Sequence, residues 1–175
     1  MNFHARILAV LLAAATTQSA FASDGTINFK GELLDSTCAV AVNGATSTVT
    51  LPKLSAAMLK TAKNIAGQTG FNIHLSACTG KTTTAAAFFE SGPGVDPLTF
   101  NVKSSGTAKF VQLQLVDFEG KAIKAGDVDQ ITPTSRVAKA ASGDTILPYA
   151  VQYVATGEAT PGSVEGVVTY SINYQ

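Results

Sequence analysis

Charged residues are scarce in this chain of 175 residues, histidine occurs twice and tryptophan is absent. Lys, Arg, Asp and Glu together make up 14% of the sequence, and the 12 basic residues balance the 12 acidic ones. A near-neutral chain with no basic stretch gives no electrostatic reason to expect nucleic acid or anionic lipid as a partner. The composition instead suits a surface that packs against other protein.

The sequence also lacks the side-chain patterns that indicate catalysis. His74 lies in an apolar segment, and no nucleophile-elbow motif is present to form a hydrolytic triad with it. A glycosidase would need two placed carboxylates, whereas Glu90, Asp117 and Glu119 fall at predicted strand ends or turns. We therefore expect no enzyme activity, no cofactor and no metal site.

No apolar run is long enough to cross a bilayer as a helix. The run over residues 7–15 follows a short start whose only full charge is Arg6, and it is followed by Ala20-Phe21-Ala22. Charge, apolar run and small-x-small site occur in the order of a secretory signal peptide. Residues 1–22 are thus predicted to be cleaved after export, and the alternative is a buried N-terminal helix.

Cysteine is limited to Cys38 and Cys78. In an exported protein, a single pair of cysteines most simply forms one disulfide. The competing interpretation is a metal site, which would need further ligands, and His74 is the only histidine of the mature chain. We therefore expect the disulfide.

Helical periodicity is nearly absent from the mature chain, whereas period-two alternation recurs throughout. A short helix within residues 55–64, capped by Ser55, is the main exception. Pro148 favours an edge position for the strand that contains it. The predicted strands, joined by loops rich in Gly, Pro, Thr and Ser, indicate a single all-β sandwich or small barrel; they cover residues 25–33, 34–42, 49–51, 71–75, 85–90, 110–116, 122–123, 145–154 and 164–175.

Both ends of the mature chain alternate strongly. In residues 25–33 the odd positions are apolar or glycine and the even positions are polar. In the last strand one face is apolar, and the strand runs to Gln175; that face consists of Val168, Tyr170, Ile172 and Tyr174. A strand edge left open in this way is a liability unless something covers it.

Three motifs, taken in order after a signal peptide, resemble the type 1 fimbrial subunits of the chaperone–usher pilin family. GTINFKG at residues 25–31, followed by Asp35-Ser36-Thr37-Cys38, resembles the family's N-terminal extension and first cysteine. GFNIHLSAC at residues 70–78 resembles the strand that carries the second cysteine, and TYSINYQ at residues 169–175 resembles the closing strand with its penultimate tyrosine.

The resemblance implies an incomplete immunoglobulin-like sandwich that lacks its last strand. In such a fold, residues 23–33 are an extension that acts as the donor strand for a neighbouring subunit, and residues 34–175 are the pilin domain. The alternative is that residues 25–33 form an ordinary first strand of a self-contained sandwich. The side chains expected to enter the neighbour's groove, or to approach its backbone closely, are those of Gly25, Ile27, Phe29, Gly31 and Leu33.

The resemblance also implies partners and a location. The expected function is that of a structural subunit of a bacterial fimbria, carried through the periplasm by a chaperone, delivered to an outer-membrane usher and displayed on the cell surface, where the fibre supports adhesion. The alternative is a single-domain adhesive minor pilin that binds a carbohydrate or host receptor. The strand expected to pair with the chaperone, and later with the donor, contains Val168, Tyr170, Ile172, Tyr174 and Gln175.

Overall fold

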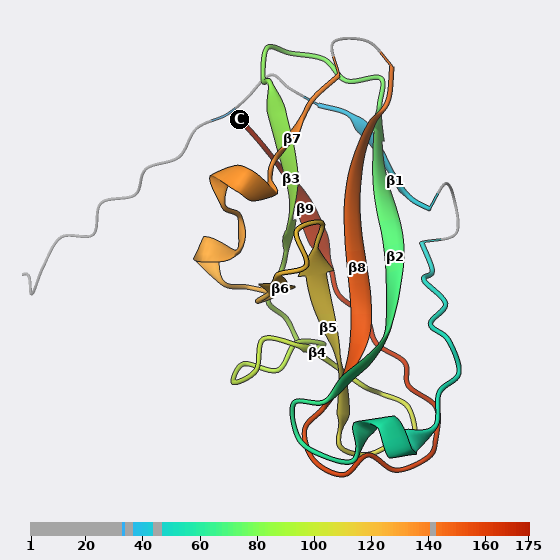
Figure 1. Ribbon diagram of the computed structural model, residues 1–175. Helices are drawn as coiled ribbons and strands as arrows, with labels where there is room; N and C mark the ends of the chain where they lie inside the picture. The colour runs from blue at the N-terminus through green and yellow to red at the C-terminus, as the bar shows by residue number, and fades with distance from the viewer. Residues whose placement is uncertain (1–32, 34–36, 44–46, 141–142) are drawn as a thin grey trace, which may run out of the picture. The chain divides into compact units, whose positions relative to one another are not determined.

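The computed structural model describes Leu33 and residues 37–43, 47–140 and 143–175 (Figure 1). The chain divides into two units, Met1–Leu33 and Leu34–Gln175, and all the described strands belong to the second. The predicted signal peptide lies outside the described residues, as do Gly25, Ile27, Phe29 and Gly31 of the predicted donor strand. Leu33 is described and is fully exposed.

The second unit contains two antiparallel sheets (Figure 1). The larger sheet has the order β1-β2-β8-β5-β4, with β6 paired to β5, and the smaller has the order β7-β3-β9. The strands of the larger sheet are β1 (Ala39–Val42), β2 (Ile65–Ser76), β4 (Val102–Lys103), β5 (Val111–Asp117), β6 (Ala122–Ile123) and β8 (Thr145–Ala155). Those of the smaller are β3 (Thr84–Phe89), β7 (Val137–Ala138) and β9 (Tyr170–Tyr174), and the 3-10 helices are η1 (Ala56–Leu59), η2 (Val128–Gln130) and η3 (Pro133–Ser135).

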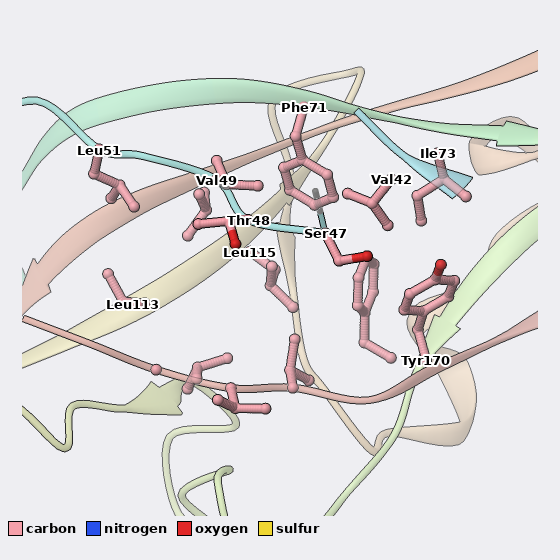
Figure 2. A pocket seen from close by; sticks show the side chains of 16 residues that line it. Val42, Ser47, Thr48, Val49, Leu51, Phe71, Ile73, Leu113, Leu115 and Tyr170 are labelled. Atoms are coloured by element: carbon pink, nitrogen blue, oxygen red, sulfur yellow. The ribbon is translucent and has the colours of Figure 1, made fainter. Parts of the chain in front are cut away.

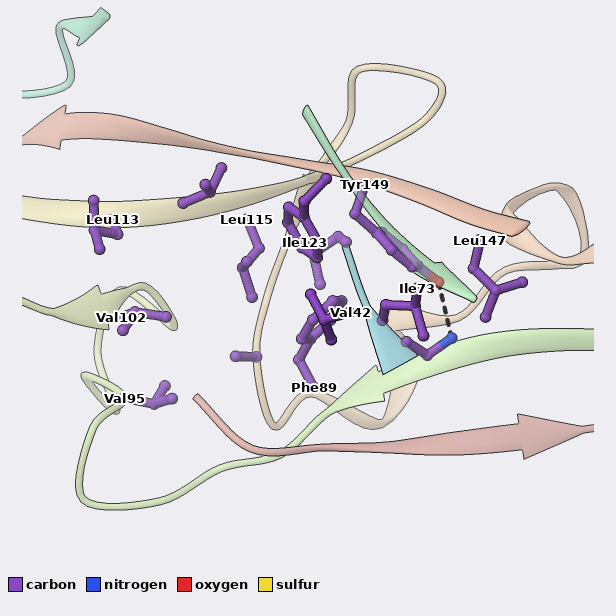
Figure 3. Close-up of a cluster of buried hydrophobic side chains, with 14 of the residues drawn as sticks. Val42, Ile73, Phe89, Val95, Val102, Leu113, Leu115, Ile123, Leu147 and Tyr149 are labelled. Carbon is purple, nitrogen blue, oxygen red and sulfur yellow. Dashed lines mark hydrogen bonds between the residues drawn. The ribbon is translucent and has the colours of Figure 1, made fainter. Parts of the chain in front are cut away.

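The core lies between the sheets, because each strand turns alternate side chains inward. Ile73 of β2 pairs with Leu147 of β8, and both are completely buried. Phe89 of β3 faces them from the smaller sheet (Figure 3). His74, one residue along β2 from Ile73, is only half-buried beside the exposed Ile146. His74 therefore lies on the outer face of β2.

A buried tyrosine links the two sheets. The Tyr149 hydroxyl of β8 accepts a hydrogen bond of 2.8 Å from the backbone N–H of Ala87 in β3 (Figure 3). The ring packs edge-on against Phe89, with centroids 5.2 Å apart. Burial raises the pKa of the Tyr149 phenol, so the hydroxyl is held in its neutral form. Tyr149 is therefore a core residue that fixes the sheets against each other.

The local predictions are confirmed in some places and wrong in others. Ser55 caps η1, because its hydroxyl accepts from the Ala57 N–H, and a disulfide joins Cys38 to Cys78. The edge position that Pro148 favoured is wrong: β8 is a central strand between β2 and β5. Pro148 has no N–H to donate to β5, but β5 ends opposite Tyr149, the residue after the proline. The proline therefore interrupts no hydrogen bond between β5 and β8.

A candidate strand-accepting groove

One edge of β9 is open. In β9 the residues at odd positions pair with β3, as the two bonds between Gln175 and Thr84 show. In an antiparallel pair the intervening amides and carbonyls point the other way. The backbone groups of Tyr170, Ile172 and Tyr174 therefore face away from β3, and no described residue pairs with them.

On the side of β3 that faces away from β9, the backbone amides of β3 have partners. β7 pairs with β3 only at Thr84 and Ala85, yet the next outward-facing amides of β3 find other partners. The Ala87 N–H donates to the Tyr149 hydroxyl, and the Phe89 N–H donates to Oε1 of Gln130 at 2.8 Å. Buried backbone groups are normally paired in this way. The amides of β3 are thus paired on both sides, whereas those of Tyr170, Ile172 and Tyr174 in β9 pair with no described residue.

An apolar cavity of about 330 Å3 runs beside the open edge (Figure 2). One lip is formed by residues 47–51 and the other by residues 166–170. The floor consists of core side chains, so the hydrophobic interior of the sandwich is reached directly from this side. The floor residues are Val42, Phe71, Ile73, Phe89, Val102, Leu113, Leu115 and Val151. Together, the two lips and this floor are the groove.

The predicted side chains of the last strand line the groove or pack beside it. Val168 and Tyr170 are lining residues, and Val168, Tyr170, Ile172 and Tyr174 all pack against the core while remaining only half-buried. Partial burial raises the pKa of both Tyr170 and Tyr174. In the paired strand β3, by contrast, the side chains opposite Tyr174 and Tyr170, those of Ala85 and Phe89, are fully buried. The core is therefore less completely covered along β9.

The backbone groups of Gln175 face β3, unlike those of Tyr170, Ile172 and Tyr174. Its backbone N–H and C=O both bond to Thr84, and its carbonyl also accepts from the Thr83 N–H. The residue therefore anchors the end of β9 to β3 and does not belong to the open edge. The regular strand is also shorter than predicted, since β9 begins at Tyr170 and residues 164–169 form the lip before it.

A second cavity of about 490 Å3 lies farther along the same two segments of the chain. Residues 53–59 continue from the first lip and residues 159–164 lead into the second. Val164 packs against both the main core and a small satellite cluster around Leu59 and Val111. The second cavity therefore prolongs the groove toward the end of the sandwich where η1 lies (Figure 1).

Sequence reasoning finds the β9 side of the groove and misses the other lip and the floor. The strand predicted over residues 49–51 is wrong, because these residues are a lip without regular strand pairing. Among the described residues, no group of three or more His, Cys, Asp and Glu side chains is placed to hold a metal ion. The part of the chain that the structure describes also contains no helix long and apolar enough to span a membrane.

An all-β sandwich with an open strand edge beside an exposed core has the geometry to accept an additional strand. The similarity of this chain to known proteins identifies its family. The family model for the type-1 fimbrial protein A (FimA) matches residues 51–175, and the chain therefore belongs to this family of structural fimbrial subunits. This confirms the family predicted from the three sequence motifs.

Individual proteins agree with the family match. The chain is 37% identical to the F17 fimbrial protein of Escherichia coli, over 94% of this chain and 95% of that protein. It is 38% identical to the major fimbrial subunit SMF-1 of Stenotrophomonas maltophilia, over 92% and 98% of the two chains. The crystal structure of the P pilus rod subunit PapA superposes with a TM-score of 0.59 at 18% identity, covering 79% of this chain and 99% of that one. The predicted all-β pilin fold is thus confirmed.

Proposed function

We propose that this chain polymerises into a fimbria by donating residues 23–33 to the groove of a neighbouring copy. The observation that carries the proposal is the open edge of β9 beside an apolar cavity floored by the core. An added strand would pair with the free backbone groups of Tyr170, Ile172 and Tyr174, which is the general mode of β-augmentation. Its alternate side chains would cover the exposed floor.

Residues 23–33 have the pattern that such an occupant needs. Ile27 and Phe29 supply apolar side chains on one face, and Gly31 on the same face suits a place where two backbones approach closely. Residues 23–33 and the lip-and-strand segment 164–175 are also of nearly equal length. An extended donor would therefore reach from Gln175 to the second cavity, with Leu33 at that end.

The direction of the donor follows from the positions of the chain ends. Residue 37 lies at the end of the sandwich where β9 finishes, because Thr37 bonds to Thr79 and the disulfide joins the neighbouring Cys38 to Cys78. A donor parallel to β9 would bring both neighbouring subunits to this one pole, and a fibre could not extend. An antiparallel donor places them at opposite poles and reproduces the strand order of a complete immunoglobulin-like sheet.

Export and assembly follow the family pattern in this proposal. The predicted signal peptide over residues 1–22 would direct the chain to the periplasm, where a chaperone strand would cover β9 until an outer-membrane usher joins the subunits. An exposed groove needs a partner at every stage, because an open sheet edge with an apolar floor favours aggregation. The match to a relative named as a major fimbrial subunit favours a structural role over the alternative of an adhesive minor pilin.

The test is whether the donor segment completes the fold. We expect a synthetic peptide of residues 23–33 to bind the purified mature protein and to raise its melting temperature. A peptide with Gly31→Leu should bind much more weakly, because a bulky side chain would meet backbone, whereas Lys30→Gln on the outer face should bind nearly as well as the natural sequence. A mature protein that melts in one transition unaffected by any of these peptides would contradict the proposal.

A further inference from the structure

Four lysines gather at the pole of the sandwich that contains η1. This surface, which we call the lysine pole, consists of residues 53–64, 107–110 and 156–163. It contains one acidic residue, Glu158. Since the whole chain has no net charge, the pole is a local concentration of positive charge; its lysines are Lys53, Lys60, Lys63 and Lys109, all of them exposed.

Backbone contacts bring these lysines together from distant parts of the sequence. Lys109 donates from its N–H to the Thr160 hydroxyl, and its carbonyl accepts from the Thr160 N–H. Lys60 directly follows Leu59, whose carbonyl accepts from the Ala159 N–H. Lys53 lines the second cavity itself, and Lys60 and Lys109 each directly follow a residue that lines it.

None of these four lysines forms an ion pair with a carboxylate among the described residues, and Glu158 offsets only one of the four positive charges. The one ion pair within the described part of the chain joins Lys124 to Asp127, far from the lysine pole in sequence. The remaining positive charge gives this surface a positive potential that attracts an anionic group. The surface is suited to an acidic partner.

We infer that the lysine pole binds the acidic junction, residues 32–36 of the neighbouring copy, and guides its donor strand into the groove. The inference rests on the proposed function, in which the antiparallel donor leaves the groove at this pole. The junction has the sequence ELLDS, so Glu32 and Asp35 supply two negative charges and no positive one. Glu32 directly precedes Leu33 at the end of the donor and Asp35 follows it, so both would come to the end of the groove beside these lysines.

The expected effect is chiefly on the rate of association. Exposed ion pairs add little to the stability of a complex, but complementary charge around a cleft raises the encounter rate of the two partners. We expect a labelled peptide of residues 23–36 to bind the mature protein about tenfold faster at low salt than the same peptide with Glu32→Gln and Asp35→Asn. The difference should vanish near 1 M salt, where charges are screened beyond about 3 Å.

The experiment measures association by fluorescence anisotropy with both peptides and three proteins. The mature protein with Lys53→Gln, Lys60→Gln and Lys109→Gln should bind both peptides at the same slow rate. The control, Lys121→Gln, changes an exposed lysine in the turn between β5 and β6 at the other end of β5, and it should retain the tenfold preference.

Two results would overturn the inference alone. The peptides could bind the wild-type protein equally fast at low salt, or the triple variant could keep the preference for the acidic peptide. In either case the donor would still bind, and the proposed function would stand. If neither peptide bound at any salt concentration, the proposed function itself would fail, and this inference would fail with it.

Discussion

Replacing Val151 by phenylalanine should close part of the groove without damaging the domain. Val151 lies on the inner face of β8 and contributes to the groove floor. The cavity of about 330 Å3 is roughly twice the ~150 Å3 cavity that holds a benzene ring in an engineered core. One added ring therefore fits, and it occupies space that the donor strand would otherwise use. The isolated subunit should keep its melting temperature or gain slightly.

Leu147→Phe is the matched control for this change. Leu147 lies on the same face of the same strand, but it is completely buried and does not line the groove. Enlarging a side chain in a filled core costs about 1–3 kcal/mol of folding free energy. Leu147→Phe should therefore lower the melting temperature, whereas Val151→Phe should not.

Binding of the donor peptide should show the reverse order. In Val151→Phe the added ring and the donor compete for the same space, so the overpacking cost of about 1–3 kcal/mol arises only when the peptide of residues 23–33 binds. The peptide should therefore bind this variant roughly 5- to 150-fold more weakly than wild type. Calorimetric titration and thermal melting of both variants check the two effects separately. The reasoning would be refuted if Val151→Phe bound the peptide like wild type or were destabilised as much as Leu147→Phe.

Three further changes test other parts of the account. Cys38→Ser removes a disulfide that closes 40 residues and should cost about 4 kcal/mol, measured by denaturant unfolding. Tyr149→Phe leaves the buried Ala87 N–H without its acceptor and should cost about 1–3 kcal/mol in the same assay; a variant as stable as wild type would contradict the sheet-linking role. Deleting Tyr174 and Gln175 removes the anchored end of β9 and should abolish co-purification with the periplasmic chaperone, which full recovery of the complex would disprove.

The strands of this fold can be predicted where the alternation of side chains is regular. The strands predicted over residues 110–116 and 145–154 correspond to β5 and β8 with small changes at their ends. The last strand is amphipathic as predicted, but its regular part is limited to Tyr170–Tyr174. A regular strand needs a hydrogen-bonding partner, and β3 pairs with Tyr170–Tyr174 and makes its last bond, from Glu90, to Thr169. Residues 164–168 lie beyond the end of β3. Local sequence cannot show where a partner strand stops.

The groove and the lysine pole cannot be predicted from sequence because both depend on distant pairings. Tyr149 and Ala87 are 62 residues apart, and only the register of the two sheets brings the hydroxyl to that amide. Lys60 follows Leu59, which bonds to Ala159, and Lys109 bonds to the next residue, Thr160. The prediction from Pro148 is wrong for the same reason, since tolerance of the proline depends on where β5 ends. Residue type and spacing define the strands, whereas packing decides which distant segments lie side by side at the groove and the lysine pole.

Amide hydrogen exchange along β9, followed by NMR, tests the central claim most directly. In the isolated mature protein the amides of Tyr170, Ile172 and Tyr174 should exchange rapidly, while those of Ser171, Asn173 and Gln175 should be protected by β3. Adding the peptide of residues 23–33 should protect the first three amides and leave the others slow. If all six amides were equally protected before the peptide was added and did not change afterwards, β9 would have no open edge and the claim of a strand-accepting groove would be contradicted.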